Sequence, residues 1–257
     1  MNLSPLVKRT LHAQPCRKWI AGLGTFLGAM PAIFITGVVV AQPVPGCGAL
    51  QNAFGPYDYR PDKYVYETTY GSHKNRVNIV ERAHFTIETE MLVSRKTGLV
   101  VPPGADLSYT LRAFPNHHRA LMTLIALSEK EKTDKPRESI YTVDCWFRRA
   151  VAWVPDDNIV KMIYSTYLVK TNRKKEAEEQ LETAAQQAGD NVFTHHNLGL
   201  VYVDMKMYDR ALFHAHKTYG LGMSVQTLKE QLKAAGKWSE PAEANVNEPA
   251  PTSKKPD

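Results

Sequence analysis

The stretch NIVKMIYSTYLVKTNRKKEAEEQLETAAQQAGDN, residues 158–191, is followed directly by VFTHHNLGLVYVDMKMYDRALFHAHKTYGLGMSV, residues 192–225, and this pair decides the fold. Superimposed, the two stretches align residues of similar size and polarity. The aligned pairs are Tyr164 and Leu198, Ser165 and Gly199, Leu168 and Tyr202, and Ala177 and Ala211. A constant offset of 34 residues indicates an internal repeat.

Each stretch predicts two helices joined by a turn. In the first stretch, residues 159–168 are apolar on two sides, as a helix must be when it packs on its partner and on the next unit. After a polar turn, residues 173–188 place Ala177, Leu181 and Ala184 on one face at helical spacing. The small side chains at positions 165 and 199 predict close approach of the paired helix of the same unit.

The order Leu198-Gly199-x-x-Tyr202, followed nine residues later by Ala211, resembles the tetratricopeptide repeat, a helix-turn-helix unit. The chain departs from that family at position 161, a lysine, and at position 195, a histidine, where a tryptophan is usual. The resemblance implies an all-α solenoid, in which the first helices of successive units line a concave surface that holds a peptide or a partner helix.

The repeat domain is predicted to span residues 116–238. Upstream, Phe147, Ala150 and Pro155 have the spacing of the end of a unit, whose first helix would begin at Asn116 as the N-cap. The two helices of this unit would be joined by a long connection near residues 131–139. The full division is units at about 116–157, 158–191 and 192–225, a capping helix at 225–235, and a proline-rich tail at 239–257 that we expect to be disordered.

Residues 1–41 are predicted to be a signal peptide or a membrane anchor. Four basic residues and no acid precede the apolar stretch 19–40, which ends in the small-residue sequence Val39-Val40-Ala41. This pattern is typical of a secretory signal that is cleaved after Ala41. The apolar stretch is also long enough to stay in the membrane as an anchor, and Cys47 weakly resembles a lipid-attachment site. Each alternative exports the remaining chain, so we expect it in the bacterial periplasm.

Export changes what the net charge implies. The whole chain has 32 basic and 26 acidic residues, a formal charge of +6 at pH 7. Removing residues 1–41 leaves 28 basic and 26 acidic residues, so we expect no nucleic-acid partner. A mean hydropathy of -0.36 excludes a polytopic membrane protein.

Two cysteines, Cys47 and Cys145, remain after export. In an oxidising compartment, two cysteines most simply form a disulfide. The alternative is that Cys145, which lies beside Trp146 and Phe147, is a buried apolar thiol.

The segment 42–115 differs from the repeats. Its sequence GPYDYRP, residues 55–61, is predicted to be extended, and its tyrosines either pack on the repeats or form an exposed patch. We expect one helix at about 76–94 and a loop at 99–107. Periodicity leaves residues 107–114 open between helix and strand.

No motif predicts catalysis, a cofactor or a resident metal, so we expect a protein that is not an enzyme. Glu81, His84 and Glu88 share one side of the predicted helix and resemble half of a di-iron carboxylate site, without its second half. The alternatives are a metal or small-ligand binding protein that uses such histidines and glutamates, or an enzyme with an unrecognised site.

The predicted function is therefore a non-catalytic scaffold, or an accessory or assembly factor of an envelope complex, that binds a protein or peptide partner. The resemblance assigns partner contacts to the concave face, which carries Met162, Thr166, Lys170, Phe193, His196, Asn197, Leu200 and Asp204. A mixed apolar and polar lining suits an extended peptide or a helix. The alternative occupant of this face is the N-terminal segment of the same chain.

Overall fold

The computed structural model describes residues 43–60, 73–97 and 99–241. Within these residues the chain forms ten helices and one hairpin of two short strands, which confirms the mostly helical fold class. The predicted signal or anchor at 1–41 and the tail beyond residue 241 lie outside the described residues. In the described part of the chain, no helix is both long and apolar enough to cross a membrane.

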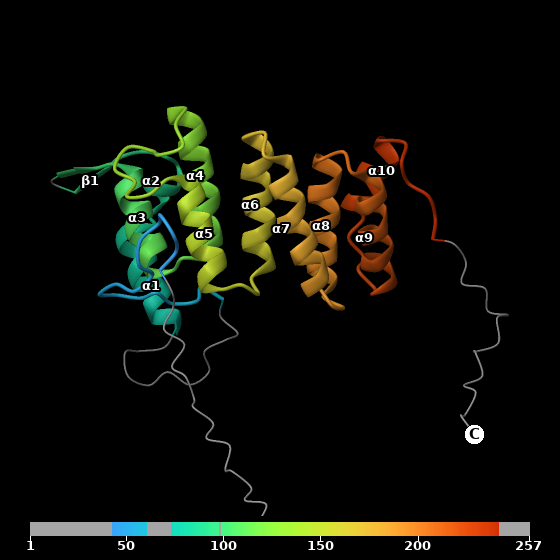
Figure 1. Ribbon diagram of the computed structural model, residues 1–257, viewed down its shortest axis with the longest axis horizontal. Coiled ribbons are helices and arrows are strands. Elements are labelled where there is room, and N and C mark those ends of the chain that lie inside the picture. Colours follow the sequence, from blue (N-terminus) through green and yellow to red (C-terminus); the bar gives the residue numbers. More distant parts are fainter. Residues whose placement is uncertain (1–42, 61–72, 98, 242–257) are drawn as a thin grey trace, which may run out of the picture. The chain divides into compact units, whose positions relative to one another are not determined.

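Seven helices form a row in the C-terminal part of the described chain (Figure 1). They are α4 (His118–Glu131), α5 (Val143–Trp153), α6 (Asn158–Lys170), α7 (Lys174–Gln187), α8 (Val192–Asp204), α9 (Tyr208–Gly220) and α10 (Thr227–Ala234). α6 packs most extensively on α7, and α8 on α9, so these helices form two hairpins. α4 contacts α6 and α6 contacts α8, whereas α10 covers α8 and α9.

The turn after α4, α6 and α8 is built in the same way three times. Lys132, Asn172 and Lys206 adopt the left-handed conformation, with φ of 53°, 61° and 57°. In each case the next amide donates to the carbonyl oxygen five residues earlier, at 3.1 Å for the first turn and 2.8 Å for the other two. This bond and the left-handed residue define a Schellman-type helix end.

The starts of α6 and α8 are also equivalent. Each helix is capped by the side chain of the residue before it. Lys161 Nζ donates to Pro155 O, and His195 Nε2 donates to Gly189 O at 2.9 Å. The two side chains are 34 residues apart, and both reach the carbonyl group six residues earlier in the preceding loop.

A continuous apolar core runs through the row of helices. It includes Leu168, Ala177 and Tyr202, all of which the sequence pattern placed on buried faces. A side chain added at Gly199 would collide with Leu228 of α10. The close approach predicted at position 199 occurs, but the helix that approaches is α10 and not the paired helix α9, so the predicted partner is wrong.

Five elements precede this row: α1 (His73–His84), α2 (Ile87–Glu90), β1 (Arg95–Thr97), β2 (Leu99–Val101) and α3 (Pro103–Ala113). The single helix predicted at 76–94 is wrong. The chain turns after α1 because Phe85 enters the core, and this leaves Ile87 and Met91 of the predicted apolar stripe exposed. The loop predicted at 99–107 is also wrong, since β2 pairs with β1 and α3 begins at Pro103, a residue suited to a first helical turn.

Lys206→Gly is expected to stabilise the protein, because the left-handed conformation strains any residue that carries a Cβ atom. We expect the free energy of unfolding in urea to rise by about 0.5–1 kcal/mol. Lys217→Gly, on the exposed side of α9 where the backbone is helical, is the matched control and should lower it by a similar amount. Earlier unfolding of Lys206→Gly than of the wild type would contradict this account of the turn.

Candidate functional site

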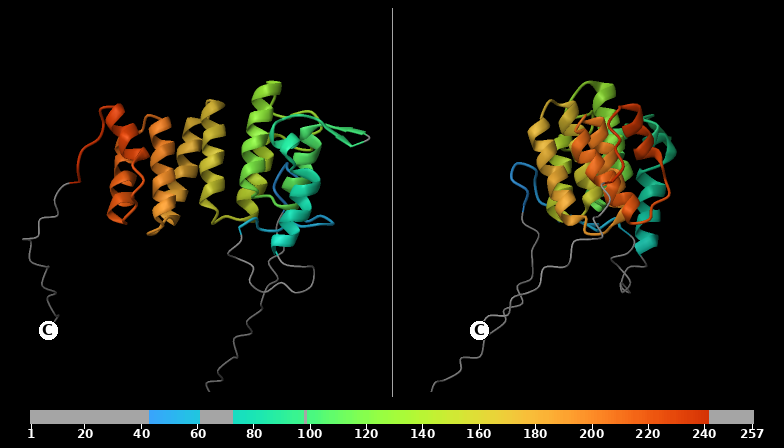
Figure 2. Two further views of the ribbon diagram at one scale, coloured as in Figure 1. Left: turned by 180° about the vertical axis from the view of Figure 1, so that it is seen from behind. Right: turned by 90° about the vertical axis from the view of Figure 1, so that its right-hand side faces the viewer.

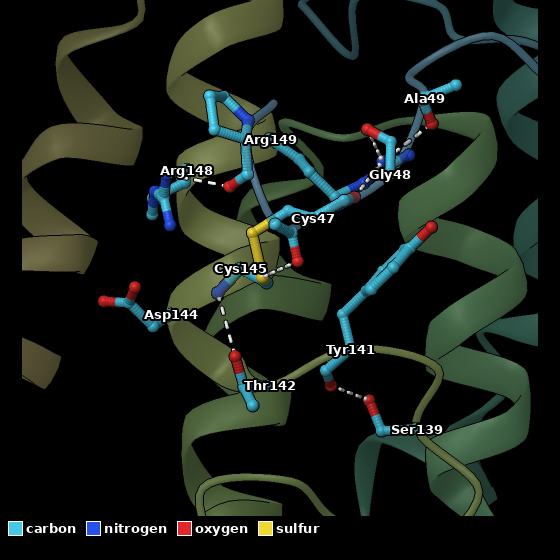
Figure 3. The surroundings of a disulfide bond; sticks show 12 residues. Cys47, Gly48, Ala49, Ser139, Tyr141, Thr142, Asp144, Cys145, Arg148 and Arg149 are labelled. Carbon is cyan, nitrogen blue, oxygen red and sulfur yellow. Dashed lines mark hydrogen bonds between the residues drawn. A yellow bond between two sulfur atoms is a disulfide. The ribbon is translucent and has the colours of Figure 1, made fainter. Parts of the chain in front are cut away.

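The predicted disulfide between Cys47 and Cys145 is confirmed (Figure 3). It joins Cα atoms that are 5.3 Å apart in space and 98 residues apart in sequence. Cys47 lies in the segment 43–60, which precedes every described helix, and Cys145 lies on α5. The bond therefore fastens this N-terminal segment to the row of helices.

One turn along α5 from the disulfide, Arg149 is buried. Its Nη1 donates to Cys47 O and to Ala49 O, both at 2.8 Å (Figure 3). The guanidinium lies over the rings of Tyr141 and Trp146, with its Cζ 4.8 and 5.5 Å from their centroids. Burial lowers the pKa of Arg149 below its usual range. Carbonyl dipoles and aromatic faces thus replace the water around the cation.

After the residues held by the disulfide and Arg149, the N-terminal segment packs its tyrosines on the junction between α3 and α4. The ring centroids of Tyr57 and Phe114 are 5.8 Å apart, and Tyr59 stacks on His117 at 4.1 Å. The amide of Tyr57 also donates to Ala113 O at 2.8 Å. Tyr59 therefore packs on the start of the predicted repeat domain, as expected, whereas Tyr57 packs on Phe114 just before that domain.

Asn116 joins the N-terminal segment to α6. It is fully buried, and its Nδ2 donates to Asp58 Oδ1 at 2.7 Å and to Asp157 Oδ2 at 2.8 Å, while its Oδ1 accepts from the amide of Tyr59 at 2.8 Å. The predicted role of Asn116 as the N-cap of α4 is therefore wrong. His117 caps α4 instead, because the amide group of Asn116 is used by these three longer-range bonds.

Asp157 connects α4 to α6. Its Oδ1 caps α6, and its Oδ2 lies 2.8 Å from Nε2 of His118. Burial alone would raise the pKa of Asp157, but the hydrogen bonds from His118 and Asn116 hold it below the ordinary value. Next to it, Arg60 Nη2 donates to Asp156 Oδ1 at 2.9 Å. Internal hydrogen bonds and ion pairs therefore hold these charged side chains in place.

These polar groups form one wall of a cavity of 460 Å³ at the N-terminal ends of α4, α6 and α8. The cavity is lined by Tyr59, Arg60, His118, Asp156, Asp157, Asn158, Ile159, Asn191 and Thr194. No pattern in the sequence predicts this cavity, because its walls depend on bonds between residues 39 to 96 positions apart. The only sequence signal was the aromatic and charged composition of residues 55–61.

Beside this cavity, the second residues of α4, α6 and α8 occupy equivalent positions. The second residue of each helix is Arg119 in α4, Ile159 in α6 and Phe193 in α8. Ile159 is 42% exposed and Phe193 is 68% exposed, whereas Arg119 is paired with Glu90. Equivalent positions on two neighbouring helices thus present large apolar side chains to solvent.

The predicted partner-binding residues differ in exposure. Lys170, Phe193, Asn197 and Asp204 are exposed, and Thr166, His196 and Leu200 are half-buried. Met162 is only 4% exposed and belongs to the core, so its predicted contact with a partner is corrected. It is covered because α6 packs between α4 and α8. Lys170 pairs with Glu129 of α4 across the same face.

The three residues that resembled half of a metal site do not converge. Glu81 bonds to His117, and His84 Nδ1 lies 3.0 Å from Asp106, while Glu88 is exposed on α2. No group of three or more potential metal ligands occurs among residues 43–60, 73–97 and 99–241.

A second buried polar contact lies between α8 and α9. Nδ1 of His195 and Nδ1 of His214 are 2.9 Å apart. In a neutral His195 ring, donation from Nε2 to Gly189 O leaves Nδ1 as the acceptor, and His214 then donates from its own Nδ1. Burial, followed by the nearby His195 and Arg210, lowers the pKa of His214 to about 4.

No protein-family model, curated protein or solved structure matches the chain.

Arg149→Met is expected to lower the free energy of unfolding by about 2–4 kcal/mol, because it leaves buried carbonyl groups without a donor. Urea unfolding under oxidising conditions measures this loss. Arg148→Met is the matched control: its exposed side chain donates to Pro45 O, and its loss should cost less than about 1 kcal/mol. Equal losses in the two variants would show that the buried cation does not anchor the segment.

Acid is expected to destabilise the α8–α9 hairpin through His214. In the unfolded chain, His214 titrates near its unperturbed pKa of 6.5. Between pH 6.5 and about pH 4, this side chain therefore binds more protons in the unfolded state than in the folded state. Relative to His214→Gln, the wild type should therefore lose up to about 1.4 kcal/mol of stability per pH unit as the pH falls through this window. Urea unfolding of both proteins between pH 6.5 and about pH 4 measures this loss. Free energies of unfolding that fall in parallel with pH in the two proteins would refute the role of His214.

Proposed function

We propose that the chain is an exported tetratricopeptide-type scaffold without catalytic activity. In this proposal it binds an extended segment of a protein partner along α4, α6 and α8, and serves as an accessory or assembly factor of an envelope complex. The observation that carries the proposal is the exposure of Ile159 and Phe193 at equivalent positions beside one cavity.

Three repeated turns and two equivalent helix starts support the tetratricopeptide-type assignment. The left-handed residues after α6 and α8 are 34 residues apart, as are the side chains at 161 and 195 that bond to the preceding loops. α4 contacts α6 and α6 contacts α8, as expected if these helices are the first helices of successive units. The disulfide supports an oxidising compartment outside the cytoplasm.

The position of the N-terminal segment supports a foreign partner over an internal one. Residues 43–60 contact α3, α4, α5 and the α5–α6 loop. Phe193 lies on α8, further along the row, and most of its surface is exposed. Asn197, one turn further along α8, is exposed and offers both a donor and an acceptor to a peptide backbone.

A library of displayed random peptides, selected on the intact protein, is expected to yield binders with a large apolar residue. Phe193→Ala should weaken the selected peptides by at least about tenfold in fluorescence anisotropy, as truncation of a central aromatic contact does. Phe213→Ala is the matched control, because Phe213 is a similarly exposed phenylalanine on α9. Equal binding by the two variants would reject this face as the binding surface.

A further inference from the structure

The β1–β2 hairpin projects from the end of the helical row (Figures 1 and 2). Its sequence context, LVSRKTGLVVPPG at residues 92–104, contains two basic residues and no acid. Leu99 is 81% exposed and Val100 is 63% exposed. Two large apolar side chains thus lie in water on a small projecting element, and transfer of either one into an apolar phase would be favourable.

The two apolar side chains lie on opposite faces of the hairpin. The strands pair antiparallel, with Lys96 opposite Val100 and Thr97 opposite Leu99. Successive residues of a strand point to opposite faces, so Leu99 and Val100 cannot both face one flat surface. A protein partner that docks on one side would cover one of them, whereas a fluid lipid interface would surround both.

The base of the hairpin is fixed to the helical part by an ion pair. Arg95 donates from Nη2 to Asp106 Oδ1 at 2.9 Å and from Nε to Asp106 Oδ2 at 3.1 Å. Asp106 is buried, so the charge of Arg95 is balanced inside the protein. Lys96, in contrast, is exposed beside the apolar residues, where its ammonium group could meet an anionic headgroup.

We propose that this hairpin inserts into the headgroup region of a membrane that contains anionic phospholipid. Leu99 and Val100 enter the boundary between headgroups and acyl chains, and Lys96 pairs with a lipid phosphate. Insertion is shallow, because the outer edges of both strands carry backbone groups that must stay hydrated. This contact is independent of partner binding on α4, α6 and α8, and it would hold the helical row at the membrane surface.

The test uses the full chain with Leu99→Trp and vesicles of phosphatidylethanolamine and phosphatidylglycerol that carry bromine on the upper acyl chain. Because position 99 is exposed, the new side chain does not disturb the core. After subtraction of the wild-type spectrum, the tryptophan emission should shift to shorter wavelength and be quenched. Phe213→Trp, on α9, is the matched control and should show neither change. The probe reports on the hairpin whether or not residues 19–40 are retained.

Adding Lys96→Gln to the Leu99→Trp protein should weaken its vesicle affinity about fivefold at low salt, the effect of one basic residue near an anionic surface. Emission that does not change with vesicles, or equal quenching at positions 99 and 213, would overturn the proposal. A shift that appears without lipid and grows with protein concentration would also overturn it, since a second copy of the chain would then cover the tip.

Discussion

Arg149 carries a positive charge in the interior, and a charge is tolerated there only because the N-terminal segment brings its carbonyl groups to it. Gly48 allows the N-terminal segment to turn around the guanidinium of Arg149. Its φ is 71°, and an added side chain would collide with the hydroxyl of Tyr141. The disulfide lies one turn away and holds the same loop. Arginine, carbonyl groups and disulfide therefore act as one anchor, in which each part fixes the position of the others.

The position of the cavity follows from this anchor through a chain of contacts. The anchored segment packs Tyr57 and Tyr59 on the end of α3, and Tyr59 bonds to Asn116. Asn116 in turn bonds to Asp157, which caps α6. A covalent bond on α5 is thus connected, through polar and aromatic contacts, to the first turn of the helix that carries Ile159. Fixing one end of the row in this way favours a preorganised surface, which loses less entropy when a ligand binds.

The helical hairpins could be predicted from the sequence because their contacts repeat at short, regular spacing. Tyr164, Leu168 and Ala177 are buried as the aligned stretches indicated, and a disulfide was the expected state of the two cysteines that remain after the predicted export. The cavity could not be predicted, because Asn116 and Asp157 are polar residues that meet across 41 positions, and no local pattern relates them. The helix predicted at 76–94 failed for a different reason. Its apolar residues follow a regular helical spacing, but the chain turns at Phe85, and the spacing alone gives no sign of that turn.

Lys161 and His195 show why the repeat is clear at apolar positions and faint at polar ones. A lysine and a histidine share neither charge nor shape, yet each closes the same contact with the carbonyl group six residues earlier. In these two hairpins a donor of different chemical type occupies the same place. The two units also differ in what surrounds the donor: Lys161 also bonds to Gln187, whereas His195 pairs with His214. Equivalent backbone positions can therefore carry different electrostatics without any change of fold.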